Sequence, residues 1–176
     1  MDNKFIIVFP IIAITLGGYL FPISKNKEKP VFQPPDWFFG YIWTYISFAL
    51  GYITYKFINS NSIQAKNKIK TLKLYFGILF CLVYWLYLNY KKLEKESFYL
   101  LVITCFISII FLVFLAKISK KELKYLVWFL LPLPYWLVLA SCLNAVNYNN
   151  QVEVWKFINS GLFNTNAFFT FSEDLL

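Results

Sequence analysis

The chain contains no histidine and no arginine, and its single methionine is Met1. The lack of histidine excludes His-based zinc sites and Ser-His-Asp triads, and the lack of internal methionine also excludes the common His or Met haem ligation. All 17 basic residues are lysine, so the planar arginine fork that usually reads phosphates and bases is missing. Because the lysines lie between apolar runs, the formal charge of +8 does not indicate a nucleic-acid partner.

Charge is scarce as well. Only 15% of the residues are charged, whereas a soluble globular domain carries about 25%. Hydrophobic residues make up 59% of the chain and aromatic residues 22%, which excludes disorder and indicates a membrane protein. The three cysteines, Cys81, Cys105 and Cys142, each fall in a separate apolar run, so we interpret them as small apolar core residues rather than as a disulfide framework.

Five apolar runs predict an all-α membrane protein built as a bundle of five transmembrane helices. The predicted spans are residues 5–21, 37–57, 72–90, 98–116 and 125–148, followed by a tail over 149–176. Tyr19-Leu20-Phe21-Pro22 offers no small-x-small cleavage site, so the first run is interpreted as a retained span rather than a signal peptide. Short loops between the spans predict a single domain over residues 1–176.

The lysines are unevenly divided between the two ends of such a bundle. The end that holds the N-terminus and the second and fourth loops carries ten lysines and two acids, whereas the other end carries seven of each. The positive-inside rule then predicts a cytoplasmic N-terminus, with the first loop and the C-terminus on the opposite side.

The second span begins after a proline pair, Pro34-Pro35, which is followed by Asp36 and Trp37. We expect Asp36 to cap the helix rather than to act as a catalytic acid, because no basic or nucleophilic residue accompanies it. Small residues then recur down one face of the helix and predict close packing on another helix. These residues are Gly40, Thr44, Ser47, Gly51 and Thr54.

The fifth span holds a candidate binding face. Trp136, Ala140 and Asn144 are spaced i, i+4 and i+8, with Leu143 beside them. One interpretation is a recess with an aromatic floor and one amide, and the other is helix packing in which Asn144 bonds a neighbouring helix.

The six tryptophans also allow two interpretations. Trp37, Trp85 and Trp155 are explained by the enrichment of tryptophan at membrane interfaces. Trp43 and Trp136 lie deeper in their spans, where their rings suit stacking on a flat apolar ligand.

Two blocks of the sequence resemble the TspO/translocator protein family, also called tryptophan-rich sensory proteins or peripheral benzodiazepine receptors. The first block runs from Pro30 through Phe32-Gln33-Pro34-Pro35-Asp36-Trp37, Gly40 and Trp43 to Gly51-Tyr52, and the second comprises Pro132, Trp136, Ala140, Leu143 and Asn144. Trp85 matches a tryptophan of the family's third span.

The resemblance implies a five-helix bundle, often a homodimer, that requires no cofactor and binds porphyrins and related tetrapyrroles, cholesterol or synthetic aromatic ligands. It implies ligand-binding roles for Trp43, Trp136, Ala140, Leu143 and Asn144, and a lid loop that includes Phe32, Pro34, Pro35 and Trp37. Ile78 and Leu82 stand where the family has a Gln and an Asn, which makes the expected pocket less polar.

Three functions therefore stand as hypotheses. The first is a non-enzymatic membrane receptor or transporter for a tetrapyrrole or a similar flat apolar or sterol-like molecule. The second is a photo-oxidative porphyrin-degrading enzyme, although the spans lack general acid-base residues. The third is a regulatory membrane protein that acts through partner proteins and uses Gly51 and its stripe to form oligomers.

Overall fold

The computed structural model describes residues 4–22, 33–119 and 121–149, and within these ranges the chain is helical with no strand. The helices are α1 (Phe5–Leu20), α2 (Asp36–Asn59), α3 (Ala65–Tyr90), α4 (Glu94–Ile118), α5 (Lys121–Trp128) and α6 (Pro132–Asn149). Helices α5 and α6 together form the fifth span, so the predicted all-α bundle is confirmed. The predicted tail lies outside the described residues, apart from its first residue.

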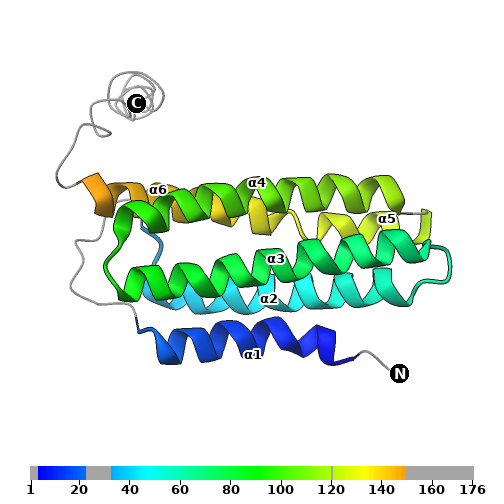
Figure 1. Ribbon diagram of the computed structural model, residues 1–176, viewed down its shortest axis with the longest axis horizontal. Helices are drawn as coiled ribbons and strands as arrows, with labels where there is room; N and C mark the ends of the chain where they lie inside the picture. The colour runs from blue at the N-terminus through cyan, green and yellow to red at the C-terminus, as the bar shows by residue number, and fades with distance from the viewer. Residues whose placement is uncertain (1–3, 23–32, 120, 150–176) are drawn as a thin grey trace, which may run out of the picture.

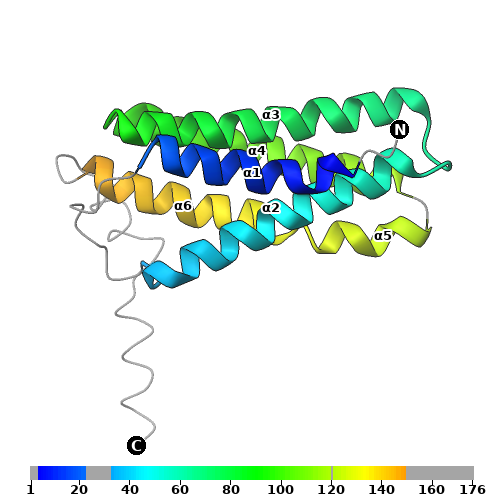
Figure 2. The ribbon, with the colours of Figure 1, turned by 90° about the horizontal axis from the view of Figure 1, so that it is seen from below.

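The helices run roughly along one axis and pack as neighbours in a bundle (Figure 1). Helix α4 packs between α3 and α6, whereas α1 packs on α2 and α3. Helix α2 crosses the bundle obliquely and reaches α5 (Figure 2). This arrangement brings the start of α2, the end of α3 and the start of α6 toward the same part of the bundle core.

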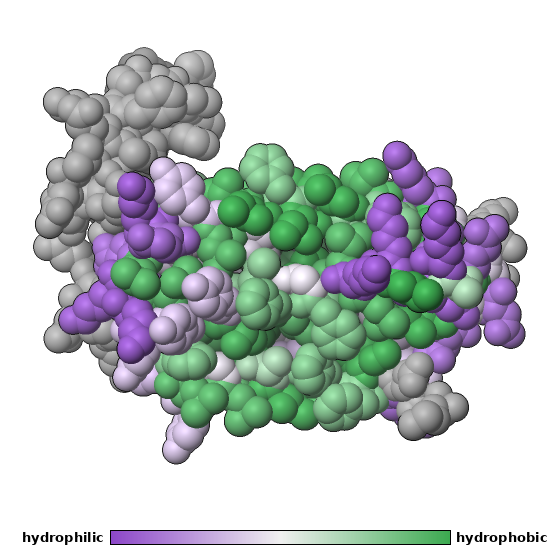
Figure 3. All heavy atoms as spheres, viewed as in Figure 1, coloured by the Kyte–Doolittle hydropathy of each residue, from purple (hydrophilic) through white to green (hydrophobic). Residues whose placement is uncertain are grey.

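The outer surface is apolar along most of the bundle and hydrophilic at both ends (Figure 3). Three segments are long and apolar enough to cross a membrane: α3, α4 and Leu123–Val146. Helix α1 is a shorter apolar helix of 16 residues. Helix α2 has 24 residues but is not among these segments, because its tyrosines, tryptophans and threonines lower its mean hydropathy.

Three predicted loops are shorter in the structure than the sequence predicts. Helix α3 begins at Ala65 rather than near residue 72, and α4 begins at Glu94 rather than near residue 98. Helix α4 also runs to Ile118 and α5 begins at Lys121, which shortens the loop between the predicted fourth and fifth spans. Most of the added residues are lysine, glutamate and alanine, which favour a helix, so the helices continue beyond the apolar runs. Lysines 66, 68 and 70 therefore lie on a helix and not in a loop.

The expected cap of α2 is also placed differently. The capping residue is Pro35, and Asp36 is the first residue of the helix. A carboxylate in the first turn still interacts favourably with the positive end of the helix dipole. The prediction of Asp36 as the capping residue was wrong by one position, while the rigid proline entry to the helix is present.

The second half of the small-residue stripe on α2 is buried, and Gly51 within it packs against α1. Ser47, Gly51 and Thr54 are buried, whereas Gly40 faces open space. A side chain at Gly51 would meet the backbone carbonyl oxygens of α1, at 2.8 Å from that of Ile6 and closer still to that of Ile7. The hypothesis that Gly51 forms oligomers was wrong, because this residue is covered by the chain's own first helix.

A second contact fixes α1 at the same level. Pro10 lies inside α1 and lacks the N–H that would bond the carbonyl of Ile6 four residues earlier. The hydroxyl of Tyr75, from α3, donates a hydrogen bond to that carbonyl at 2.9 Å. We call Ile6, Pro10, Gly51 and Tyr75 the α1 joint, because together they hold the first helix to the second and third.

The fifth span is interrupted just before its prolines. The amides of Phe129, Leu130 and Leu131 each bond the carbonyl three residues earlier, and α6 then starts at Pro132. The amide of Leu133 bonds Leu130, which leaves the carbonyl of Phe129 without its usual helical donor. The Tyr45 hydroxyl of α2 donates to this carbonyl at 3.1 Å, so a side chain supplies the missing bond.

Tyr45→Phe is expected to lower the free energy of unfolding by about 1 kcal/mol, because the Phe129 carbonyl loses its donor. Urea unfolding in detergent, followed by tryptophan fluorescence, measures this loss. Tyr41→Phe is the matched control, since Tyr41 is 77% exposed on the same helix and makes no hydrogen bond that the structure describes. Equal effects of the two changes would contradict a role for the Tyr45 hydroxyl at the break.

Candidate functional site

Three tryptophans from three helices meet in the bundle. Trp43 of α2 is stacked on Trp85 of α3, with ring centroids 5.9 Å apart and an interplanar angle of 29°. Trp43 also meets Trp136 of α6 edge to face, at 6.2 Å and 90°. The two deep tryptophans singled out from the sequence are therefore in direct contact, and a third joins them. We call Trp43, Trp85 and Trp136 the tryptophan cluster.

The start of α2 adds two phenylalanines to this cluster. The rings of Phe38 and Phe39 lie 5.9 and 5.2 Å from that of Trp136. Trp37 is 70% exposed and its ring contacts that of Phe38 at 5.9 Å. A continuous series of aromatic rings thus leads from the surface at the first turn of α2 to the buried Trp136.

The predicted lid residues are only partly described. Pro34 is partly buried, and Pro35 and Trp37 are exposed at the entry to α2. Phe32 lies outside the described residues. The described part of the lid therefore stands next to the tryptophan cluster through Trp37 and Phe38.

The other predicted binding residues of the fifth span are all buried. The exposed fractions are 2% for Trp136, 5% for Ala140, 6% for Leu143 and 7% for Asn144. They lie on α6, whose main neighbour is α4. The structure therefore places these four residues on the inner face of α6.

Asn144 bonds a neighbouring helix through a buried polar network. Its carbonyl oxygen accepts a hydrogen bond from the Ser97 hydroxyl of α4 at 2.9 Å, and its amide donates to the carbonyl of Ala140 at 2.9 Å. Ser97 in turn accepts from the Asn89 amide of α3 at 2.7 Å, and the same amide donates to the carbonyl of Trp85 at 2.9 Å. The network links α3, α4 and α6 immediately beside the tryptophan cluster.

Ser97→Ala is expected to lower the free energy of unfolding by about 2 kcal/mol, because it leaves the Asn144 oxygen and one Asn89 N–H buried without these hydrogen-bond partners. Thermal unfolding in detergent measures the loss. Ser108→Ala is the matched control on the same helix, since the Ser108 hydroxyl donates only to the backbone carbonyl of Cys105. A loss no larger than that of the control would show that the network does not join the helices energetically.

Two indole N–H groups of the cluster have no hydrogen-bond partner among the described residues. They belong to Trp85 and Trp136, whose side chains are 8% and 2% exposed. Buried indoles usually find an acceptor, and an unpaired buried donor costs about 1–3 kcal/mol. The cluster therefore combines flat aromatic surface with two unused donors.

Sequence reasoning missed several members of this site. Trp85 was explained as an interface residue, which was wrong because it is buried against Trp43. Its match to the family's third-span tryptophan was the signal for an inner position. Asn89 and Ser97 gave no signal, since each lies at a helix end where polar residues are ordinary.

Comparison with known proteins agrees with this geometry. The model of the TspO/MBR family matches residues 6–149, which covers all the described helices almost completely. The Tryptophan-rich protein TspO of Archaeoglobus fulgidus is 28% identical over 153 residues, which cover 80% of this chain and 92% of that protein. The chain therefore belongs to the TspO/MBR family, and its apolar helices make it an integral membrane protein that contacts the lipid bilayer.

Proposed function

We propose that this protein is a membrane receptor or transporter that binds a tetrapyrrole, or a similar flat apolar molecule, at the tryptophan cluster. The observation that carries this proposal is the meeting of three tryptophan rings with two buried N–H donors that have no partner among the described residues. Aromatic faces suit planar ring systems, and an unpaired donor favours a ligand that brings an acceptor atom.

The polar atoms of the site support an uncharged or acceptor-bearing ligand. The carbonyl oxygen of Asn144 already accepts a hydrogen bond from Ser97, whereas the indole N–H groups of Trp85 and Trp136 have no partner among the described residues. The described residues of the cluster and its network carry no charge. A porphyrin offers a flat apolar face and carboxylate or carbonyl oxygens at its edge, whereas a sterol offers the apolar face with a single hydroxyl.

The experiment is a titration of the purified protein in detergent with protoporphyrin IX, followed by quenching of tryptophan fluorescence. Trp43→Phe and Trp136→Phe are each expected to weaken binding roughly two- to tenfold, because each removes stacking surface. Trp136→Phe also removes an unpaired N–H, so the stability of the ligand-free protein should fall less than the lost packing alone would predict.

Trp128→Phe is the control, since Trp128 lies on α5, is 68% exposed and has no described ring contact with the cluster. Its affinity for protoporphyrin should match that of the unchanged protein. If the Trp43→Phe, Trp136→Phe double variant binds as tightly as this control, the tryptophan cluster is not the binding site.

Binding is favoured over porphyrin degradation because the part of the site that the structure describes has no acid-base groups. The described residues of the cluster and its network are tryptophan, asparagine, serine and phenylalanine, none of which exchanges protons near neutral pH. We expect the absorption spectrum of protoporphyrin to persist under light with the protein present. Light-dependent loss that requires Trp43 and Trp136 would instead support the enzyme hypothesis.

The cytoplasmic N-terminus, the opposite C-terminus and the homodimer form part of this proposal. The orientation rests on the excess of lysine at the end of the bundle that holds the N-terminus. The homodimer rests on the family alone.

A further inference from the structure

Lysines from two neighbouring helices meet at one end of the bundle. Lys66 and Lys70 are one turn apart on α3, and Lys117 lies in the last turn of α4. The Lys70 ammonium lies over the ring of Phe114 of α4, 4.7 Å from its centroid, which places Lys70 at the seam between the two helices. Phe114 and Lys117 are three residues apart and therefore neighbours on α4. We call Lys66, Lys70 and Lys117 the seam lysines.

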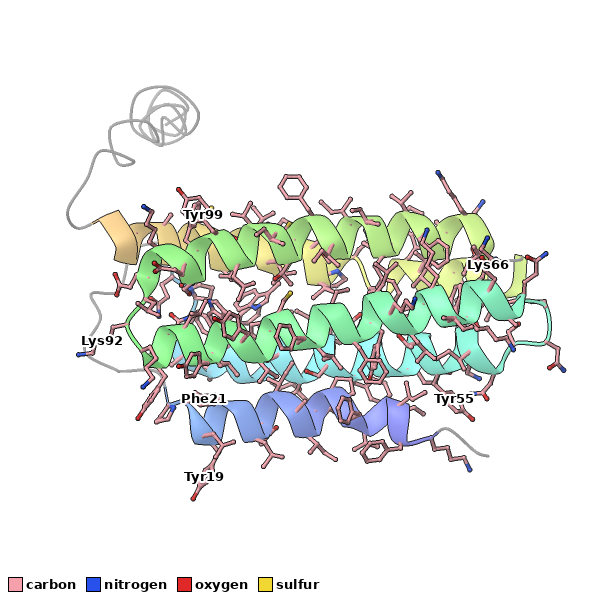
Figure 4. All side chains as sticks on the ribbon, viewed as in Figure 1. Tyr19, Phe21, Tyr55, Lys66, Lys92 and Tyr99 are labelled. Carbon is pink, nitrogen blue, oxygen red and sulfur yellow. The ribbon has the colours of Figure 1, made fainter. Side chains whose placement is uncertain are left out.

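Lysine far outnumbers acid at this end of the bundle, where the sequence places ten lysines and two acids, Asp2 and Glu122. The acids Asp36, Glu94 and Glu96 stand at the starts of α2 and α4, which lie at the opposite end. Figure 4 shows the two ends clearly, with Lys66 at one and Lys92 at the other. The hydrophilic surface near Lys66 is visible in Figure 3. Like charges brought together repel one another, so the seam attracts an anion.

The seam also lies at the right depth for a lipid headgroup. Lys66 and Lys70 stand on the first turns of a helix whose remainder is a candidate membrane span, and Lys117 ends another such helix. All three side chains are exposed, and their long apolar stems can lie along the helices while the ammonium groups reach the headgroup level. The anions present at this level of a bilayer are lipid phosphates.

We propose that the seam lysines bind the phosphate of an anionic phospholipid, with the acyl chains lying along the apolar outer surface of the bundle (Figure 3). The cation–π contact with Phe114 orients the Lys70 side chain for this role. Because that contact already restricts the conformations of the side chain, less conformational entropy is lost when the lipid binds. This site is separate from the tryptophan cluster, and its occupant is part of the membrane itself.

The test places the protein in phosphatidylcholine bilayers and measures, by electron paramagnetic resonance, how strongly it holds spin-labelled phosphatidylglycerol relative to spin-labelled phosphatidylcholine. Each lysine near a membrane surface contributes roughly a five-fold preference for an anionic lipid. The unchanged protein should therefore prefer phosphatidylglycerol. The triple variant Lys66→Gln, Lys70→Gln, Lys117→Gln should lose at least five-fold of that preference.

The matched control removes three lysines from the opposite end, as Lys91→Gln, Lys92→Gln, Lys95→Gln. It should keep the preference, because acids accompany these lysines at that end. If both variants lose the preference for phosphatidylglycerol equally, the proposal is overturned, because the preference would then come from the overall charge of the protein and not from the seam lysines. Displacement of phosphatidylglycerol by inorganic phosphate, beyond that by chloride at the same ionic strength, would also overturn it, since the site would then select a free anion. Thermal unfolding shows whether each variant is folded, and protoporphyrin titration tests the tryptophan cluster independently.

Discussion

Gly51→Ala should destabilise the protein by about 3 kcal/mol, at the upper end of the cost of overpacking a well-packed contact. The added methyl group would meet the backbone carbonyls of Ile6 and Ile7, and a backbone cannot turn aside as a flexible side chain can. Helix α1 must therefore shift away from α2, which also strains the bond between Ile6 and Tyr75. Unfolding in detergent, followed by circular dichroism, measures the loss.

Gly77→Ala provides the control for this prediction. Gly77 is also inside a membrane-spanning helix, but a side chain there would meet nothing within 4 Å. Alanine is favoured over glycine in a helix by about 1 kcal/mol, so Gly77→Ala should leave stability unchanged or raise it. A Gly51→Ala protein as stable as the Gly77→Ala protein would contradict the close approach of α1 to α2.

Tyr75→Phe should lower the free energy of unfolding by about 2–3 kcal/mol, because it leaves the Ile6 carbonyl without a hydrogen-bond donor in an apolar environment. Tyr75 is fully buried, so water does not replace the lost hydroxyl. The size of the effect depends on Pro10, which is the reason that the carbonyl needs a side-chain donor.

A double-mutant cycle isolates this dependence. In a Pro10→Ala background the alanine N–H can bond the Ile6 carbonyl within α1, so Tyr75→Phe should then cost about 1 kcal/mol or less. The difference between the two costs is the coupling of Pro10 to Tyr75. If Tyr75→Phe costs the same in both backgrounds, the hydroxyl does not replace the missing helical bond.

The sequence was sufficient for the helices and for part of the site. Uninterrupted apolar runs predicted the spans, and the family blocks indicated Trp43, Trp136 and Asn144, all of which the structure brings to the inside of the bundle. Helix ends were less predictable, because lysine-rich segments such as the start of α3 form helix beyond the apolar run and hydropathy does not detect them.

The contacts between helices were the part that the sequence did not provide. Ser97 joins Asn89 to Asn144 only because α3, α4 and α6 converge, and no spacing within one helix encodes that meeting. The same holds for Gly51, whose place in a small-residue stripe is compatible with packing inside the chain or between chains. The position of α1 against Gly51 shows that the stripe packs within the chain at this point.

The α1 joint has a consequence for the order in which the bundle is made. During synthesis α1 emerges before α2 and α3, and Pro10 leaves it with a carbonyl that no amide four residues later can bond. Its donor, Tyr75, lies 69 residues further along the chain, on the third helix. The hydrogen bonding of α1 is thus completed only when α3 packs against it, so the folded states of the first three helices depend on one another.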